Sequence, residues 1–282
     1  MFFGLTNSLA TFQTMMDNIF REEIAQGWLK IYMDDLIITS EDDKKIHQQR
    51  VDRVLHKIKM HDLFLKAKKC SFHKKKVKYL GMIIGQGKVK MDPIKVEGIM
   101  KWPTPAMVKD VRSFLGFCNF YCSFIANFSA VARPLNDLTK KLHQWRWGTD
   151  EQASFNTLKD LCSSYLVLQS PDWTKQFFMD TDASDFTLSV VISQEFTDGR
   201  HPIAFHSHTL LPAEKNYDIH DKEMTAIVYR FKCGHPYFLG ANHPIMVHTD
   251  HKNLQYFHQP QKITGRQAHW MEFLQNYDYH LD

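Results

Sequence analysis

The sequence predicts an α+β fold in which a helical middle part separates two parts that contain β-strands. In the N-terminal part, amphipathic helical segments alternate with short β-branched runs. Helical signals dominate residues 103–168, and strand-like runs dominate the C-terminal part, which predicts a mixed β-sheet with flanking helices. A hydrophobic content of 44% with 21 Phe in 282 residues is enough for sizeable cores.

The N-terminal part is predicted to begin with a helix over residues 7–26, where large apolar residues recur at helical spacing. The run LKIYMDDLIITS predicts two short strands joined by a tight turn at its acidic pair. A second amphipathic helix is predicted over residues 42–62. The run VKYLGMIIGQGKVKMD then predicts a hairpin.

The middle part opens with TPAMVKDVRSFLGFCNFY, which predicts a helix capped by Thr104 with Pro105 in its first turn. The pattern changes near residues 165–172, where we expect a domain boundary. Three strands are predicted in KQFFMDTDA, TLSVVISQEF and HPIAFHSHTL. A long helix over residues 212–238, a strand in PIMVHTD, a helix in TGRQAHWMEFLQNY and a strand in DYHLD complete the prediction.

Several composition features exclude classes of protein. No apolar run approaches the length needed to cross a bilayer, and the N-terminus lacks the basic region of a secretory signal. The five cysteines form no CxxC pair, so we expect neither a zinc site nor a disulfide framework. These features predict a protein of a reducing compartment that is not secreted and does not bind a membrane.

The charge is unevenly distributed along the chain. Residues 41–101 contain 17 Lys or Arg and 7 Asp or Glu, whereas residues 171–282 contain 9 and 14. A basic block beside an acidic one indicates a polyanion that one part binds and another part processes. The alternative is that the basic block is an ordinary solvated face, and the charge alone does not decide between the two.

The first candidate site is the acidic pair Asp34 and Asp35 in YMDD. Two carboxylates about 4 Å apart repel each other by about 4 kcal/mol at an effective dielectric near 20, so a cation is expected between them. Carboxylates at a hairpin tip suit a divalent ion that also binds phosphate oxygens. The alternative is an ordinary turn that contains Asp.

The second candidate site is dispersed along the C-terminal part. Asp182 and Asp250 end two predicted strands, and Glu223 lies in a predicted helix. Carboxylates at strand ends that face one from a helix can converge on a pair of metal ions. The alternative is that both Asp residues cap the segments that follow and that Glu223 is a solvated helix residue. Spacing alone favours this alternative.

Almost the whole chain resembles the Pol polyprotein of gypsy-type LTR retrotransposons, from the middle of reverse transcriptase into RNase H. The runs that carry the resemblance are FGLTNSLATFQ, YMDDLIITS, KCSF, VKYLGMII, MDPIKVEGIMKWPTP, RSFLGFCNFYCSFIANFSAVARPLNDLTKK, TDAS, HPIAFHSHTLLPAEKNYDIHDKEMTAIV and VHTDHKNLQYF. They occur in the order and at the spacings of that family. The succession is more specific than any single motif.

The resemblance implies a role for each matched residue. Asp34 and Asp35 match the metal-binding pair of the polymerase, and Asp182, Glu223 and Asp250 match three acids of RNase H. Residues that match the nucleotide pocket and the template side are Phe3, Gly4, Asn7, Gln13, Tyr32 and Met33. The hairpin that holds the primer strand is matched by Leu80, Gly81 and Met82.

The resemblance also implies an architecture and a set of ligands. Residues 1–102 correspond to part of a polymerase palm with the primer-grip hairpin, residues 103–168 to a helical thumb and connection, and residues 169–282 to an RNase H-like domain. The implied activities are RNA-directed DNA synthesis and hydrolysis of RNA in RNA–DNA hybrids. The implied ligands are Mg²⁺, with Mn²⁺ as an alternative, RNA template, DNA primer, hybrid and dNTPs. Other polyprotein segments or a second copy are further implied partners, in the cytoplasm, a virus-like particle or the nucleus.

The chain also departs from the family pattern. A third polymerase aspartate and a fourth RNase H acid have no counterpart, so we expect a piece truncated at both ends with negligible polymerase activity by itself. Ser189 and Val190 replace a usual Gly-Ala pair, and Cys122 and Ser123 replace common arginines. A non-catalytic remnant that binds nucleic acid is the alternative function, and a helical scaffold with decayed sites is a weaker one.

Overall fold

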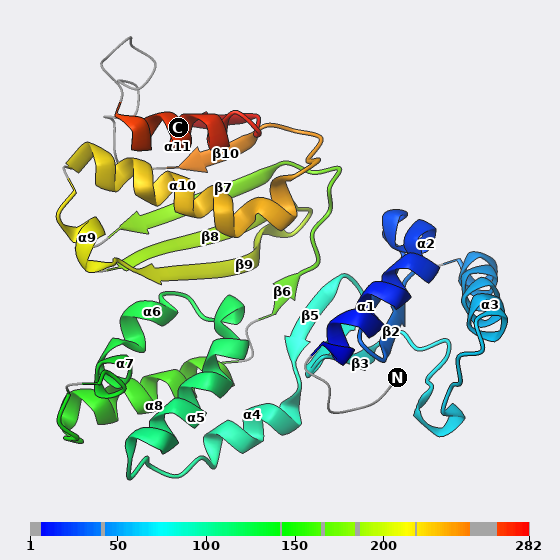
Figure 1. The fold of residues 1–282 in the computed structure, drawn as a ribbon, viewed down its shortest axis with the longest axis horizontal. Helices are drawn as coiled ribbons and strands as arrows, with labels where there is room; N and C mark the ends of the chain where they lie inside the picture. Colours follow the sequence, from blue (N-terminus) through cyan, green and yellow to red (C-terminus); the bar gives the residue numbers. More distant parts are fainter. Residues whose placement is uncertain are drawn as a thin grey trace. The chain divides into compact units, whose positions relative to one another are not determined.

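The structure is a computed structural model that describes residues 7–40, 43–141, 143–164, 167–183, 187–217, 219–248 and 264–281. It describes the backbone alone for residues 181–183, 212, 215, 219, 220 and 223. The chain folds as two compact units, Met1–Gln86 and Gly87–Asp282. Their helices and strands (Figure 1) confirm the predicted α+β class.

In the first unit, two short helices precede a hairpin, a long helix and a second hairpin. The elements are α1 (Ser8–Ile19), α2 (Arg21–Ala25), β1 (Leu29–Tyr32), β2 (Asp35–Ile38), α3 (Lys44–Met60), the 3₁₀ turn η1 (Ala67–Lys69), β3 (Val77–Tyr79) and β4 (Met82–Gly85). The single helix predicted over residues 7–26 is divided, because Phe20 leaves the helical backbone conformation and its side chain is fully buried.

The core of the first unit lies where α1, the β1–β2 hairpin and α3 meet. Its buried residues are Met16, Phe20, Trp28, Leu29, Val54 and Ile58. The carboxylate of Glu23 is buried beside this core, where it accepts hydrogen bonds from Arg53 Nε at 2.6 Å and from Lys57 Nζ at 2.8 Å. These contacts join α2 to α3. Asp43 caps α3 by accepting hydrogen bonds from the N–H groups of Lys45 and Ile46.

The second unit begins with a helical part enclosed by two paired strands. Its elements are β5 (Lys88–Met91), α4 (Pro93–Met100), α5 (Val108–Phe120), the 3₁₀ turn η2 (Cys122–Phe124), α6 (Phe128–Val131), α7 (Arg133–Leu138), α8 (Thr149–Ser163) and β6 (Leu168–Gln169). Strands β5 and β6 are antiparallel, with Val89 opposite Leu168. They connect residues that are far apart in the sequence.

Helix α5 starts at Val108, so the predicted cap at Thr104 with Pro105 in the first turn was wrong. A residue that precedes proline is disfavoured in the helical conformation, which keeps Thr104 outside the helix. The carboxylate of Asp110, inside the first turn, accepts the N–H groups of Ala106 and Met107 at 3.1 and 3.2 Å. An acidic side chain within the helix therefore caps it.

The C-terminal part of the second unit contains a mixed five-stranded sheet of order β11-β10-β7-β8-β9. Its strands are β7 (Phe177–Ala183), β8 (Thr187–Phe196), β9 (Gly199–Thr209), β10 (Ile245–His248) and β11 (Tyr279–Leu281). Strands β7, β8 and β9 form an antiparallel meander, whereas β10 runs parallel to both β7 and β11. All five strands agree with the sequence prediction.

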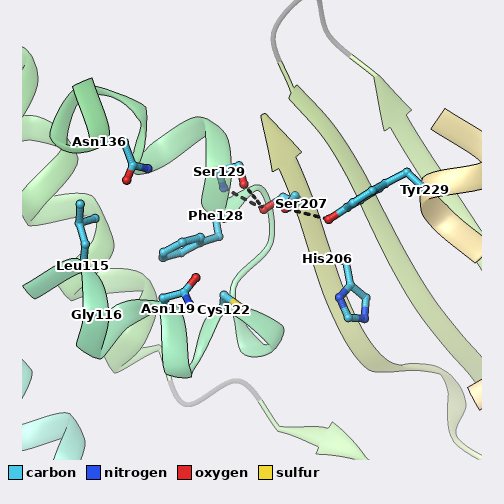
Figure 2. A pocket seen from close by; sticks show the side chains of 10 residues that line it. All are labelled: Leu115, Gly116, Asn119, Cys122, Phe128, Ser129, Asn136, His206, Ser207 and Tyr229. Atoms are coloured by element: carbon cyan, nitrogen blue, oxygen red, sulfur yellow. Dashed lines mark hydrogen bonds between the residues drawn. The ribbon is translucent and has the colours of Figure 1, made fainter. Parts of the chain in front are cut away.

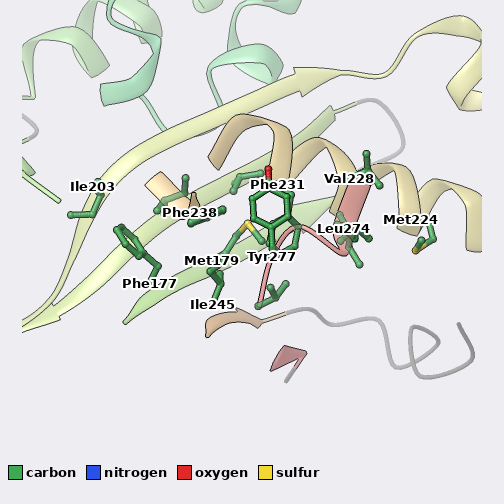
Figure 3. Packing of buried hydrophobic residues seen from close by; sticks show 14 residues of the cluster. Phe177, Met179, Ile203, Met224, Val228, Phe231, Phe238, Ile245, Leu274 and Tyr277 are labelled. Atoms are coloured by element: carbon green, nitrogen blue, oxygen red, sulfur yellow. The ribbon is translucent and has the colours of Figure 1, made fainter. Parts of the chain in front are cut away.

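Three helices accompany this sheet: α9 (Pro212–Lys215), α10 (Ile219–Phe238) and α11 (Gly265–Leu274). The predicted helix over residues 212–238 is divided, because the chain leaves the helix at Asn216. Figure 3 shows the core in which side chains of α10 and α11 pack against the sheet. Its members include Phe177, Met179, Ile192, Val228, Phe231, Val247 and Leu274.

Strand β9 is the edge of the sheet that faces the helical part. Residues of η2 and α6 contact this strand, and the N–H of Ser129 donates a 2.8 Å hydrogen bond to Ser207 Oγ. Covering an edge strand in this way prevents it from pairing with another chain. Among the described residues, every helix is too short or too polar to cross a bilayer.

Candidate active sites

The acidic pair of the first unit lies at the tip of the β1–β2 hairpin. Tyr32 and Asp35 are paired across the two strands, so Met33 and Asp34 form a two-residue turn. Met33 has a φ of 54°, in the left-handed region that residues with a β-carbon rarely occupy. Both Asp side chains are exposed at this tip, and Tyr32 beside them is 54% exposed. Two carboxylates are thus directed to solvent on a strained turn.

The side chain of Gln13, on α1, holds this turn. Its Oε1 accepts the N–H of Met33 at 2.7 Å, and its Nε2 donates to the carbonyl of Ile31 at 3.3 Å. The same Nε2 donates to Asp17 Oδ1 at 2.8 Å, which fixes the amide plane. One side chain therefore stabilises the backbone on both sides of Tyr32. Sequence reasoning placed Gln13 beside the template and missed this contact.

The hairpin formed by β3 and β4 turns at Leu80 and Gly81. Both residues have positive φ, 48° and 71°, as a two-residue hairpin turn of this type requires. Tyr79 and Met82 pair directly across the turn. Burial raises the pKa of the Tyr79 hydroxyl, and the negative charge of Asp35 raises it further. The hairpin assigned to the primer therefore lies within electrostatic range of the acidic tip, through a tyrosine that sequence reasoning did not single out.

Three further residues were assigned to the nucleotide and template, namely Phe3, Gly4 and Asn7. Phe3 and Gly4 lie outside the described residues. Asn7 is exposed just before α1, and its carbonyl accepts the N–H of Thr11 at 3.0 Å. Asn7 also lines an open groove of about 750 Å³ along α1 that reaches His61. This groove is accessible and is lined by both polar and apolar side chains of α1, among them Thr11 and Met15.

Much of the basic block is on the surface. Exposed lysines between α3 and β3 and on β3 are Lys66, Lys68, Lys69, Lys74, Lys75, Lys76 and Lys78. Two phenylalanines occur among them or just before them, Phe64 at 95% exposure and Phe72 at 46%. We call residues 64–78 the basic segment. Lysines interleaved with exposed aromatic rings are typical of surfaces that contact nucleic-acid phosphates and bases.

In the second unit, Asp182 lies near the end of β7, where its backbone pairs with Ser189 of β8. Strand β10 runs parallel to β7 and ends at His248, which is in register with Asp180. Glu223 lies in α10, the helix that packs against this sheet. Asp250 lies outside the described residues. The fold thus brings the elements that carry Asp182 and Glu223 into one layered domain.

The face of the sheet next to Asp182 carries an ion pair and two stacked rings. Arg200 donates to Asp180 Oδ2 at 2.9 Å, and its guanidinium lies 4.4 Å from the centre of the Phe178 ring. The ring of Phe178 stacks on His248 with 6.0 Å between ring centres. Asp180 lies two residues before Asp182 in the same strand, and Arg200 balances its charge.

A cavity of about 440 Å³ lies between α5 and α6 on one side and β9 and α10 on the other (Figure 2). At its centre Ser207 Oγ donates to Ser129 Oγ at 3.0 Å, and the Tyr229 hydroxyl donates to the Ser207 carbonyl at 3.3 Å. Burial raises the pKa of Tyr229 and lowers that of His206. Sequence reasoning did not predict this cavity, because its residues come from segments without a shared motif.

The donors at both acidic sites are carboxylate oxygens, the ligands that Mg²⁺ and Mn²⁺ prefer. The pair Asp34 and Asp35 supplies two carboxylates at an exposed tip. Within the described part of the chain, no group of three or more His, Cys, Asp or Glu side chains is close enough to enclose a metal ion. An ion at the tip would complete its coordination with oxygens from water or phosphate.

Comparison with known proteins adds independent information. A family model described as "Reverse transcriptase (RNA-dependent DNA polymerase)" matches residues 1–84. A second, described as "RNase H-like domain found in reverse transcriptase", matches residues 172–277. Members of these families generally use divalent metals.

Curated relatives are transposon polyproteins. The chain is 36% identical to the Retrovirus-related Pol polyprotein from transposon 297 of Drosophila melanogaster, over 99% of this chain and 26% of that protein. It is 30% identical to the Transposon Tf2-3 polyprotein of Schizosaccharomyces pombe, over 99% of this chain and 21% of that protein. The chain thus spans about a quarter of the length of these relatives.

Solved structures of similar fold come from foamy viral protease-reverse transcriptase. One, in complex with dsDNA, has a TM-score of 0.78 at 20% identity and covers 100% of this chain and 59% of that one. Another, in complex with RNA/DNA hybrid, also has a TM-score of 0.78 at 20% identity, and the match covers 100% of this chain and 39% of that one. The two family matches occur in the same order as the two acidic sites. The chain belongs to the reverse transcriptase and RNase H region of LTR-retroelement Pol polyproteins.

Proposed function

We propose that the chain contributes two metal-dependent carboxylate sites, one for nucleotidyl transfer and one for hydrolysis of the RNA strand in RNA–DNA hybrids. Asp34 and Asp35 belong to the first site, and Asp182, Glu223 and Asp250 to the second. The observation that carries the proposal is the strained hairpin tip, where two adjacent carboxylates are exposed and Gln13 holds the backbone of the turn. We further propose the division into palm (1–102), thumb and connection (103–168) and RNase H-like domain (169–282).

Both sites fit Mg²⁺, with Mn²⁺ as the alternative, because their side chains are hard oxygen donors. When bound, such ions activate an attacking oxygen and neutralise charge on the leaving group. At the hairpin tip, Asp34 and Asp35 would bind the ion, Tyr32 and Met33 would lie beside the nucleotide, and Leu80 to Met82 would hold the primer. Phe3, Gly4 and Asn7 would contact the nucleotide and template.

The proposed ligands are RNA template, DNA primer, RNA–DNA hybrid and dNTPs. The exposed lysines and phenylalanines of the basic segment support a nucleic-acid partner, since phosphate contacts from lysine hold a duplex without reading its sequence. Two structures of similar fold, solved in complex with dsDNA and with RNA/DNA hybrid, support the same partner. We place this function in the cytoplasm, including virus-like particles.

The nuclease site is tested by cleavage of a labelled RNA–DNA hybrid in the presence of Mg²⁺. We expect Asp182→Asn and Glu223→Gln each to abolish metal-dependent cleavage. The matched control is Asp180→Asn, which removes a carboxylate two residues away in the same strand and is expected to keep most of the activity. Cleavage at the wild-type rate in Asp182→Asn would refute the assignment.

The site at the hairpin tip is tested without any need for DNA synthesis. Fe²⁺ bound in place of Mg²⁺ generates hydroxyl radicals with ascorbate and peroxide, and we expect it to cut the chain near residues 33–36. The substitutions Asp34→Asn and Asp35→Asn should remove this cut, whereas Asp52→Asn, on the exposed face of α3, should keep it. A cut that survives in both tip variants would refute a metal site at the tip.

A further inference from the structure

We propose that Asp221 and Arg266 form a positioning pair that fixes the end of α10 on which Glu223 lies. The inference rests on the proposed nuclease function and adds two residues that act on Glu223 through the helix. It assigns neither of them a contact with substrate or metal. The pair joins α10 to α11, which are separated in the sequence by β10 and the residues after it.

Both carboxylate oxygens of Asp221 are bound by the start of α11. Arg266 Nη2 donates to Oδ2 at 2.8 Å, and Gln267 Nε2 donates to Oδ1 at 2.8 Å. Asp221 is only 7% exposed although it lies in the first turn of α10. A carboxylate at a helix N-terminus is normally solvated, so the burial and the two partners indicate a defined position for this turn.

The partners of Asp221 are themselves fixed. The guanidinium of Arg266 lies 4.0 Å from the centre of the Tyr217 ring and 5.5 Å from that of Trp270. Thr264 caps α11, and the amide oxygen of Gln267 accepts the Thr264 N–H at 2.9 Å. The planar guanidinium therefore connects three segments, namely the chain before α10, the first turn of α10 and the first turn of α11.

Among the described side chains of α10, Met224 is the first apolar one that packs into the core. Met224, Ile227, Val228 and Phe231 pack into the core, and the contacts of Asp221 with α11 hold the turn before them. The first N–H groups of a helix lack intrahelical partners, so an unanchored first turn frays. Glu223 lies between Asp221, which α11 holds, and Met224, which packs into the core. A ligand carboxylate must be held to within about 0.5 Å to act, and the Asp221 contacts supply that restraint.

Stability alone does not explain a charged pair at this position. The Arg266 side chain is 42% exposed, so water screens the pair and its contribution to stability is small. The two hydrogen bonds that hold the buried Asp221 carboxylate therefore indicate a geometric role. The planar, multiply donating guanidinium defines a direction that a lysine ammonium does not. Asp221 lies two residues before Glu223. Without Arg266, its buried carboxylate would also lose the cation that it binds. We therefore expect Arg266→Lys to restore only part of the function lost in Arg266→Met.

The test combines hydrogen exchange with hybrid cleavage on the same variants of the whole chain. In Arg266→Met we expect amide exchange over residues 223–226 to become about 10-fold faster, because these N–H groups bond to carbonyls of the first turn. We expect kcat for hybrid cleavage to fall about 10-fold, because a small misplacement of a reacting group lowers the rate by this order, with KM within about 2-fold. The matched control is Arg53→Met, which removes the arginine from a buried carboxylate, Glu23, in the other unit.

Each outcome bears on the inference. Faster exchange with reduced kcat in Arg266→Met, and neither effect in Arg53→Met, supports the positioning pair. Unchanged exchange over residues 223–226 overturns it, and so does faster exchange with wild-type kcat, which would indicate a merely structural contact. If Glu223→Gln cleaves like wild type, the proposed nuclease function fails and the inference fails with it. The exchange data, which need no activity, identify which of the two was wrong.

Discussion

The backbone N–H of Met33 donates a 2.7 Å hydrogen bond to the side-chain oxygen of Gln13, a residue on another element and 20 positions earlier in the chain. Met33 is the turn residue with positive φ, and it directly precedes the acidic pair. A left-handed backbone conformation at a residue with a β-carbon costs about 1–2 kcal/mol and persists when the surroundings fix it. The contact with Gln13 is such a restraint on the backbone of the turn that precedes both carboxylates.

We therefore expect Gln13→Ala to destabilise the first unit by about 1 kcal/mol, because the Met33 N–H loses its acceptor. Amide exchange at Met33 should also become faster. Urea unfolding measures the change in stability, and hydrogen exchange measures the change at Met33. The matched control is Gln48→Ala, since Gln48 also donates from a helix to an Asp four residues later, at 2.8 Å. Equal effects of the two substitutions on Met33 exchange would contradict the role of Gln13.

The buried carboxylate of Glu23 predicts a pH dependence for the first unit. Burial by itself raises its pKa, but the hydrogen bonds from Lys57 and Arg53 outweigh burial and the pKa lies below its ordinary value of 4.5. A lowered pKa stabilises the fold at pH values above 4.5, and this contribution is lost as the pH falls through the folded-state pKa. We expect Glu23→Gln to lower stability at neutral pH and to flatten its dependence on pH below 4.5.

The measurement is urea unfolding between neutral and acidic pH, followed by the NMR signal of Val54 in the core of the first unit. Glu22→Gln is the control, because Glu22 belongs to the same unit and makes an exposed ion pair with Arg53. Exposed pairs of this kind contribute little, so the control should stay within about 0.5 kcal/mol of wild type. A steep acid dependence retained in Glu23→Gln would contradict the assignment.

Two helical glycines differ in the space around them. A β-carbon on Gly234 in α10 would overlap the ring of Phe238, whereas one on Gly116 in α5 would have no neighbour within 4 Å. We expect Gly234→Ala to destabilise by about 1–3 kcal/mol through overpacking. Gly116→Ala should stabilise by about 0.5–1 kcal/mol, because alanine favours the helix. Calorimetric unfolding compares the two, and a lower melting temperature for Gly116→Ala would be inconsistent with the open space beside it.

The contact between α6 and β9 depends on one hydroxyl. Ser207 Oγ accepts the N–H of Ser129 and donates to the Ser129 hydroxyl. Ser207→Ala leaves a partly buried N–H without this partner, so we expect a loss of about 1–2 kcal/mol in unfolding free energy. Ser113→Ala is the control, because Ser113 bonds only its own exposed helix and should change stability by less than about 0.5 kcal/mol. Equal losses of unfolding free energy in the two variants would contradict a stabilising role for the contact between Ser207 and Ser129.

Strands and the acidic tip were predictable because their signals are local. Alternating and β-branched runs identified β7, β8 and β9, and the position of Asp34 and Asp35 between two apolar runs identified the hairpin tip. Helix boundaries were less predictable. The start of α5 depends on the Asp110 carboxylate and on two prolines that exclude the residues before it, and the division of residues 7–26 depends on the burial of Phe20.

The sequence by itself determined which residues carry charge and which segments are helical or extended, because periods of 3.6 and 2 residues follow from backbone geometry alone. Only the tertiary structure decided which side chains meet. The contacts of Gln13 with Met33 and of Asp221 with Arg266 each join separate elements of the chain, and the charge of Asp35 on one hairpin raises the pKa of Tyr79 on another. Contacts of this kind depend on how helices and strands pack around a core, and no local spacing encodes that packing.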